Sequence, residues 1–321
     1  MEAPDPIGPF AECDVRLKIL VMIEALFVGV GTPASAAPLD RNQVAADARW
    51  VVHVDLDAAR AATLAEKVQN RWLGNEVVTQ RLAAVKTLTG VDLAKDLDGV
   101  TFYGSRLAAD TGVVIVHAHF DENRLLGIVR GKPDYNATHY DNHTLHTWAE
   151  RKDKPGEHTV TGCVFGPELL IVGREAAEVK TALDVLDGKS AALAGSGSAL
   201  AGEVPEGTVV LAGVSGLGEA GPAFKSPIVS QSESFWAALG EQGGEVFARL
   251  EFVAKSEEAA GQFEDVVRGF RATALLQYGS DPEAREIIEK LSVRVSQRTV
   301  YVEWRGAAEG VWRLIEQELK K

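Results

Sequence analysis

The chain has 321 residues, of which 46% are hydrophobic and 25% are charged, as in most globular proteins. This length exceeds the usual size of one hydrophobic core, so we expect two domains. The formal net charge is −13, and no extended run of lysine and arginine occurs, which argues against nucleic acid and anionic membranes as partners.

Residues 1–37 have the order of parts of a secretory signal peptide. Arg16 and Lys18 precede an apolar run, and small residues from Ala34 to Ala37 follow it. The run is too short to span a bilayer stably, so we expect no integral membrane anchor after cleavage. Residues 1–14 are acidic and precede the basic pair, which fits a true translation start near Val15. The expected location is therefore secreted or periplasmic.

Export would remove Cys13 with the signal peptide and leave Cys163 in the mature chain. We therefore expect no internal disulfide, although the destination is oxidising. No cysteine stands at the expected cleavage point, so we expect no lipid attachment there. Hydrophobic cores alone must hold the mature protein together.

The expected first unit, residues 38–188, begins with a strand over 49–57. There Val52, Val54 and Leu56 alternate with polar residues, the period-two pattern of a strand with one buried face. Alanine-rich helical spacing follows over 58–86 and breaks near 74–75. A later helix is expected to be capped by Asp121, whose carboxylate can accept from first-turn N–H groups. The other predicted elements are strands over 99–104, 112–120, 143–152 and 159–173 and helices over 121–129 and 174–186.

Residues 189–204 are small and rich in glycine and serine, so we predict a linker. The second unit, residues 205–321, follows it. Ser256 before Glu257 is a good helix start, and Pro282 suits the first turn of a helix. The predicted elements are strands over 208–214 and 245–256, a strand pair over 291–306, and helices over 232–239, 257–276, 282–290 and 307–321.

The ends of the two units match each other at one constant offset. Leu169 aligns with Val300, and the segment 176–178, Ala-Ala-Glu, aligns with the same letters at 307–309. Strand, turn, strand, arginine and helix recur in the same order, which predicts duplication of one unit. We therefore expect an α+β protein of two related units, each a mainly antiparallel sheet with helices packed on one face.

This layout resembles tandem α+β repeat families of unknown function found in secreted or membrane-attached bacterial proteins. The residues that carry the resemblance are 88–104 (LTGVDLAKDLDGVTFYG), 112–129 (GVVIVHAHFDENRLLGIV) and 140–148 (YDNHTLHTW). These are fold motifs without a catalytic signature. The resemblance implies an architecture and assigns no activity.

Asp55 and Asp57 follow an apolar strand, as do the two aspartates of haloacid-dehalogenase-type phosphatases. In those enzymes one aspartate attacks phosphorus and the second handles the proton. The Gly-Thr that normally follows is missing here, and no later strand ends in an acidic pair that would hold Mg²⁺. We favour a structural reading, in which Asp57 caps the following helix and Asp55 faces solvent.

Gly216, Gly218 and Gly221 have the spacing of a dinucleotide-binding loop. Such a loop must open a helix whose N-terminus binds pyrophosphate. Pro222 and Pro227 disfavour an immediate long helix, so we predict a turn.

Histidines give the remaining candidate for chemistry. His139, His143 and His146 would share one face of a helix, as a zinc site needs. The turn residues at 141–142 and the strand-forming residues after them instead predict a strand, which places His143 and His146 on opposite faces.

A sheet could still bring three imidazoles together. His117 and His119 share one face of the predicted strand 112–120. If that strand paired with 143–148, either His143 or His146 could join them, and three imidazoles suit Zn²⁺ or Cu²⁺. The alternative is a half-exposed sheet face on which histidines are ordinary fillers.

We expect an exported, non-enzymatic binding, interaction or structural module of the cell envelope, with an envelope protein as one candidate partner. The alternative is an envelope hydrolase. It would depend on a metal held by His117, His119 and His143, or cleave phosphate esters with Asp55 and Asp57.

Overall fold

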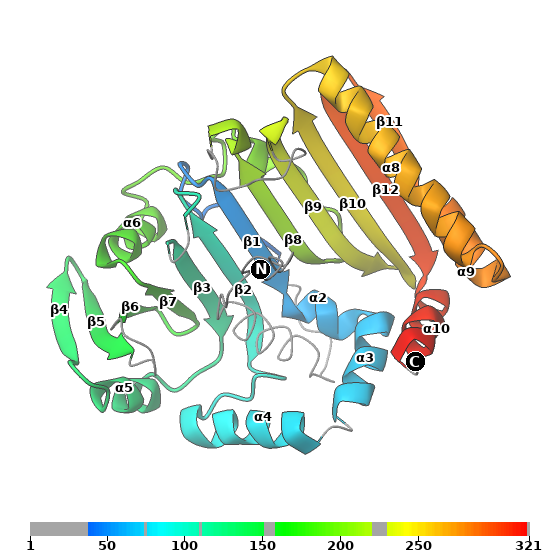
Figure 1. The fold of residues 1–321 in the computed structure, drawn as a ribbon. Coiled ribbons are helices and arrows are strands. Elements are labelled where there is room, and N and C mark those ends of the chain that lie inside the picture. The colour runs from blue at the N-terminus through cyan, green and yellow to red at the C-terminus, as the bar shows by residue number, and fades with distance from the viewer. Residues whose placement is uncertain (1–37, 74–75, 109–110, 151–157, 220–229, 320–321) are drawn as a thin grey trace, which may run out of the picture.

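The computed structural model describes residues 38–73, 76–108, 111–150, 158–219 and 230–319 (Figure 1). The predicted signal peptide, residues 1–37, lies outside the described residues. Within the described part of the chain, no helix is both long enough and apolar enough to cross a membrane.

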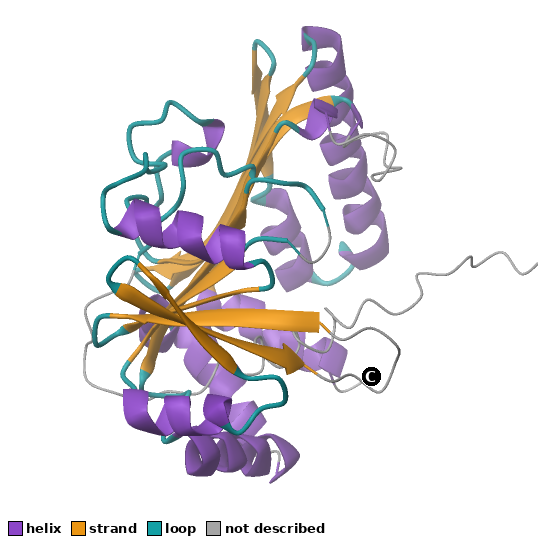
Figure 2. Cartoon of the chain, turned by 90° about the vertical axis from the view of Figure 1, so that its left-hand side faces the viewer, coloured by secondary structure: helices purple, strands orange, loops and turns teal. Residues whose placement is uncertain are grey.

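One antiparallel sheet of 12 strands runs through the described residues (Figures 1 and 2). Its order is β11-β12-β10-β9-β8-β1-β2-β3-β7-β6-β5-β4. This sheet and the helices around it confirm the α+β class. The strands are β1 (Trp50–Asp55), β2 (Leu97–Gly104), β3 (Val113–Ala118), β4 (Asn136–Tyr140), β5 (His143–Glu150), β6 (His158–Phe165), β7 (Leu169–Gly173), β8 (Thr208–Ser215), β9 (Ser232–Gln242), β10 (Glu245–Ala254), β11 (Ser292–Ser296) and β12 (Thr299–Ala307).

The strand order reads the same way outward from the centre of the sheet. β1 and β8 pair in the middle, with Trp50 opposite Val214. On each side, three consecutive strands, β1 to β3 or β8 to β10, are followed by a helical segment and a hairpin. The last strand of that hairpin pairs with the third strand: β7 pairs with β3, and β12 pairs with β10. The first side carries an additional hairpin, β4–β5. Duplication of one ancestral unit stays a prediction.

Helices cover both faces of this sheet because both faces carry apolar side chains. Val51 and Leu183 belong to one core under α6, whereas Val54 and Val100 belong to a core on the opposite face. Under α8, a third core contains Phe263. The α-helices are α2 (Leu56–Ala61), α3 (Thr63–Leu73), α4 (Glu76–Thr89), α5 (Glu122–Arg130), α6 (Ala176–Leu186), α8 (Glu257–Tyr278), α9 (Pro282–Glu289) and α10 (Ala308–Leu319), with short 3-10 turns η1 (Ala199–Ala201) and η2 (Leu217–Glu219).

Several predicted caps are confirmed. The side chain of Asp121 accepts a hydrogen bond from the backbone N–H of Arg124, and that of Ser256 accepts one from Ala259. Pro282 occupies the first turn of α9.

The helix predicted over 232–239 is wrong. These residues lie in β9, which pairs along its length with β8 on one side and β10 on the other. Ala237 and Ala238 favour a helix locally, but two neighbouring strands satisfy the backbone of this segment and override that preference.

The segment predicted as a linker, 189–204, packs onto the sheet. Leu193 and Leu200 are fully buried in the core that contains Val51. Ala192 forms an isolated bridge with Ala45. Small residues dominate the composition of this segment, but its two leucines anchor it.

Candidate functional site

The strand pairing that a shared histidine site would require is not formed. β3, which carries His117, pairs with β2 and β7, whereas β5, which carries His143 and His146, pairs with β4 and β6. Two strands separate β3 from β5 because the β6–β7 hairpin returns to pair with β3.

Two of these histidines have partners of their own on opposite faces of β5. His146 is 8% exposed, and its Nδ1 atom lies 2.9 Å from the hydroxyl of Tyr135. Burial lowers the pKa of His146. The Nε2 atom of His143 lies 3.1 Å from each carboxylate oxygen of Asp187, at the end of α6.

The other two do not complete a metal site. Burial lowers the pKa of His117. His119 lies between two carboxylates, 3.8 Å from Asp98 and 3.6 Å from Glu168. Across the described residues, no group of three His, Cys, Asp or Glu side chains is arranged to hold a metal ion, and the candidate histidines of a Zn²⁺ or Cu²⁺ site do not form such a group.

The two aspartates after β1 serve the helix that follows. Asp55 is 2% exposed and caps α2 by accepting a 2.7 Å hydrogen bond from the backbone N–H of Ala58. Asp57 is also buried and forms an ion pair with Arg60. The structural roles that we assigned to them were therefore wrong: the cap is Asp55, and neither residue faces solvent. The register differs because β1 ends at Asp55, before Asp57.

Arg60 forms a group of ion pairs and hydrogen bonds that the sequence did not predict. Its guanidinium donates to the backbone carbonyls of Ala94 and Leu97, at 3.2 Å and 3.0 Å, and lies 3.7 Å from Asp98. Burial, and then the nearby Asp57, raises the pKa of Asp98. These contacts tie α2 to the start of β2, which is a structural task.

The glycines after β8 do not open a long helix. Gly216 adopts a positive φ of 68°, and its carbonyl accepts a 3.1 Å hydrogen bond from Arg49. This backbone conformation favours glycine, and a Cβ atom here would also displace the Arg49 guanidinium, which would lie 1.8 Å away. η2 follows as a single short turn. Gly221, Pro222 and Pro227 lie outside the described residues.

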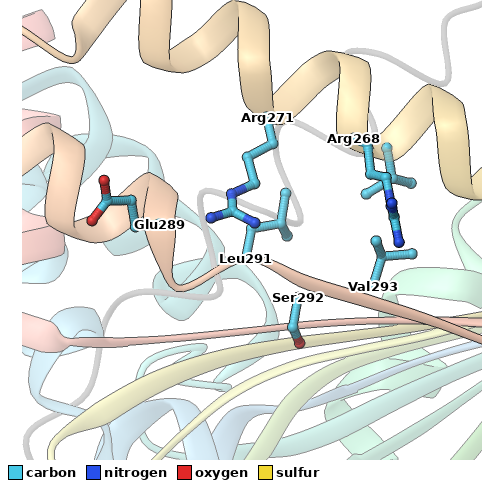
Figure 3. Close-up of a pocket in the computed structure, with 7 residues that line it drawn as sticks. Arg268, Arg271, Glu289, Leu291, Ser292 and Val293 are labelled. Atoms are coloured by element: carbon cyan, nitrogen blue, oxygen red, sulfur yellow. The ribbon is translucent and has the colours of Figure 1, made fainter.

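The structure instead presents a pocket between α8 and β11, with a volume of about 410 Å³ (Figure 3). This size is within the range of small-ligand sites. It is lined by Val267, Arg268, Arg271, Glu289, Leu291, Ser292 and Val293.

The walls of this pocket combine an apolar floor with two arginines. Val267, Leu291 and Val293 pack against the core under α8. Arg268 donates a 2.5 Å hydrogen bond to Glu264, one helical turn earlier, so its charge is already balanced. Glu289 lies at the other end of the pocket from Arg268 (Figure 3).

Arg271 is the second arginine that lines the pocket. Among the described residues, its Nε atom is enclosed and has no hydrogen-bond partner. Leaving a buried donor unpaired costs about 1–3 kcal/mol, more for charged groups. An anion that reaches this guanidinium would therefore gain a charge-assisted hydrogen bond that the protein does not supply.

The pocket is held in shape by its surroundings. Trp304 donates a 2.7 Å hydrogen bond from its indole N–H to the carbonyl of Ile287, which fastens α9 to β12. The hydroxyl of Ser292 donates to the carbonyl of Glu303 at 3.2 Å, which fastens the start of β11 to β12. The pocket as a whole can bind an anionic group at Arg271 beside an apolar group on Val267, Leu291 and Val293.

Sequence reasoning missed this pocket. The available signal was a pair of arginines spaced i, i+3 on a helix in an acidic chain, together with the alternating Val293 and Val295. The sequence does not show that α8 crosses β11, because that packing depends on the return of β12 to β10.

No protein-family model matches the chain, and no curated protein matches it. Among solved structures, the chain is similar to crystal form III of TP0453, at 10% sequence identity and a TM-score of 0.44, over 88% of this chain and 99% of that chain. It is also similar to crystal form I of TP0453, at 9% identity and a TM-score of 0.44, over 88% and 98% of the two chains. Similarity at this level carries no information about function. Membership of the tandem α+β repeat families stays a prediction.

Proposed function

We propose that this protein is an exported, non-enzymatic binding module of the cell envelope, secreted or periplasmic, whose pocket between α8 and β11 holds a ligand with a carboxylate beside an apolar group. Export is supported by the signal-peptide pattern of residues 1–37. The observation that carries the ligand class is Arg271, whose Nε atom has no hydrogen-bond partner among the described residues and which lines a pocket with an apolar floor.

The simplest probe is hexanoate, a carboxylate with a short apolar chain. In full-length protein labelled with ¹⁵N-arginine, we expect saturable shifts of the Arg271 Nε–H resonance on titration. Acetate lacks the chain and hexanol lacks the charge, so each should bind more weakly than hexanoate.

Arg271→Met should weaken hexanoate binding by roughly tenfold, the loss of one charge-assisted hydrogen bond. The matched control is Arg313→Met, which removes an arginine on α10 that pairs with Glu283, outside the pocket. Equal hexanoate affinity in the wild type and in Arg271→Met would contradict the proposal.

A further inference from the structure

β11 is the last strand of the sheet at the pocket's side. It pairs with β12, and no other described segment pairs with it. The outer edge of such a strand presents backbone N–H and C=O groups that can bond to a further strand. The strand order therefore places an open edge directly beside the pocket.

The hairpin register identifies the outward-facing groups. Ser296 and Thr299 flank the two-residue loop between β11 and β12, so they form a hydrogen-bonded pair. In an antiparallel ladder, bonding alternates along the strand, so the backbone groups of Val293 and Val295 point away from β12. The carbonyl of Arg298, in the loop just before β12, accepts from Ala254 of β10 at 2.8 Å, which agrees with this alternation.

α8 stands over the same edge. Val293 and Val295 pack their side chains toward α8, while Arg294 faces the opposite side of the sheet, 3.7 Å above the ring of Tyr301. A strand added to β11 would lie about 4.8 Å away. Alternate side chains of that strand would enter the space between α8 and the sheet, where Arg268 and Arg271 project (Figure 3).

The position of Arg271 sets the direction of the added strand. The pocket that it lines takes its residues from the start of β11, Leu291 to Val293. All neighbouring strands in this sheet run antiparallel, and an antiparallel strand on β11 would end beside the start of β11. The C-terminal carboxylate of that strand would then meet Arg271.

We infer that the ligand of this pocket is the C-terminal end of an extended polypeptide, which adds to β11 as an antiparallel strand. Its carboxylate binds Arg271, and its last side chain, an apolar one, rests on Val267, Leu291 and Val293. This inference rests on the proposed function, which supplies the carboxylate and the apolar group. Main-chain hydrogen bonds to Val293 and Val295 supply affinity for any extended chain, and the pocket supplies selectivity for an apolar C-terminus.

The test uses a fluorescein-labelled hexapeptide, Lys-Val-Thr-Val-Ser-Val with a free carboxylate, and fluorescence anisotropy with the full-length protein. Two further peptides carry backbone N-methyl groups on alternate residues. One is methylated at the odd-numbered residues and the other at the even-numbered residues. Since only one edge of the added strand faces β11, we expect one methylated peptide to lose binding at least tenfold and the other to bind as the parent does. The C-terminal amide should also bind about tenfold more weakly. If both methylated peptides bind like the parent, or both lose binding, strand addition is wrong.

A protein variant tests the same edge. Val295→Pro removes an outward N–H group, a position where an edge strand tolerates proline, and Val295→Thr is the matched control that keeps it. The proline variant should bind the peptide at least tenfold more weakly and hexanoate normally. Normal peptide binding by a folded Val295→Pro variant would contradict the inference. If this variant does not fold, the comparison of the two methylated peptides tests strand addition instead. If the wild-type protein does not bind hexanoate, the proposed function itself is contradicted.

Discussion

The residues that look chemically active in the sequence mostly form hydrogen bonds or ion pairs with neighbouring groups. Asp55 and Asp57 look like a catalytic pair in sequence, yet one caps α2 and the other pairs with Arg60. The histidines look like metal ligands, yet His143 and His146 each have a partner of their own. Arg271 differs from Arg268, the other arginine of the pocket, because its enclosed Nε atom has no hydrogen-bond partner among the described residues. At this scale, an unsatisfied group identifies a site better than a reactive residue type does.

The buried histidine His146 predicts how stability depends on pH. An unfolded histidine has a pKa near 6.5, and burial lowers the pKa of His146 in the folded chain. As the pH falls below about 6.5, the unfolded chain takes up a proton that the folded chain does not bind, so the free energy of unfolding decreases until the lowered folded-state pKa is reached. His117 acts in the same direction.

Urea denaturation between pH 7.5 and 5.5 measures this loss. His146→Gln should lose less free energy of unfolding over that interval than the wild type does, because the substituted side chain does not titrate. His139→Gln removes an exposed histidine of β4 and should follow the wild type. An identical pH dependence for His146→Gln and the wild type would show that His146 makes no contribution.

At the scale of elements, the sequence predicted the helices and strands whose formation depends on neighbouring residues in the chain. The caps at Asp121 and Ser256, the strands β1 and β10 and the helix α9 follow from periodicity and capping residues. The segment of β9 was predicted as a helix, which its alanines favour locally, and its pairing with β8 and β10 makes it a strand. The pocket between α8 and β11 escaped prediction for the same reason, since pairings between distant segments create it.

The segment 189–204 shows how two residues can outweigh composition. Leu200 is 1% exposed and packs in the core with Val51 and Leu211. Leu200→Ala should therefore lower the free energy of unfolding by about 2–5 kcal/mol, the range for a buried leucine. The matched control is Leu276→Ala, since Leu276 is 89% exposed on α8. Chemical denaturation measures both, and a loss below about 1 kcal/mol for Leu200→Ala would show that this segment is a mobile spacer.

At the scale of the whole molecule, one sheet joins the two predicted units. β1 bonds to β2 of its own unit and to β8 of the other. The core under α6 takes Ile171 from the first unit and Leu211 from the second. We therefore expect the two predicted units to unfold together, even though their elements follow one another as two separate cycles along the chain.

This expectation is tested by removing one shared side chain. Leu211→Ala should destabilise the molecule by about 2–5 kcal/mol. Because Leu211 lies at the junction, the slowest-exchanging amides of β6, in the first unit, and of β12, in the second, should lose equal protection in hydrogen-exchange mass spectrometry. Leu276→Ala, on the exposed face of α8, should leave both strands unchanged. Loss of protection in one strand alone would mean that the shared sheet does not couple the units, and that each unfolds from its own core.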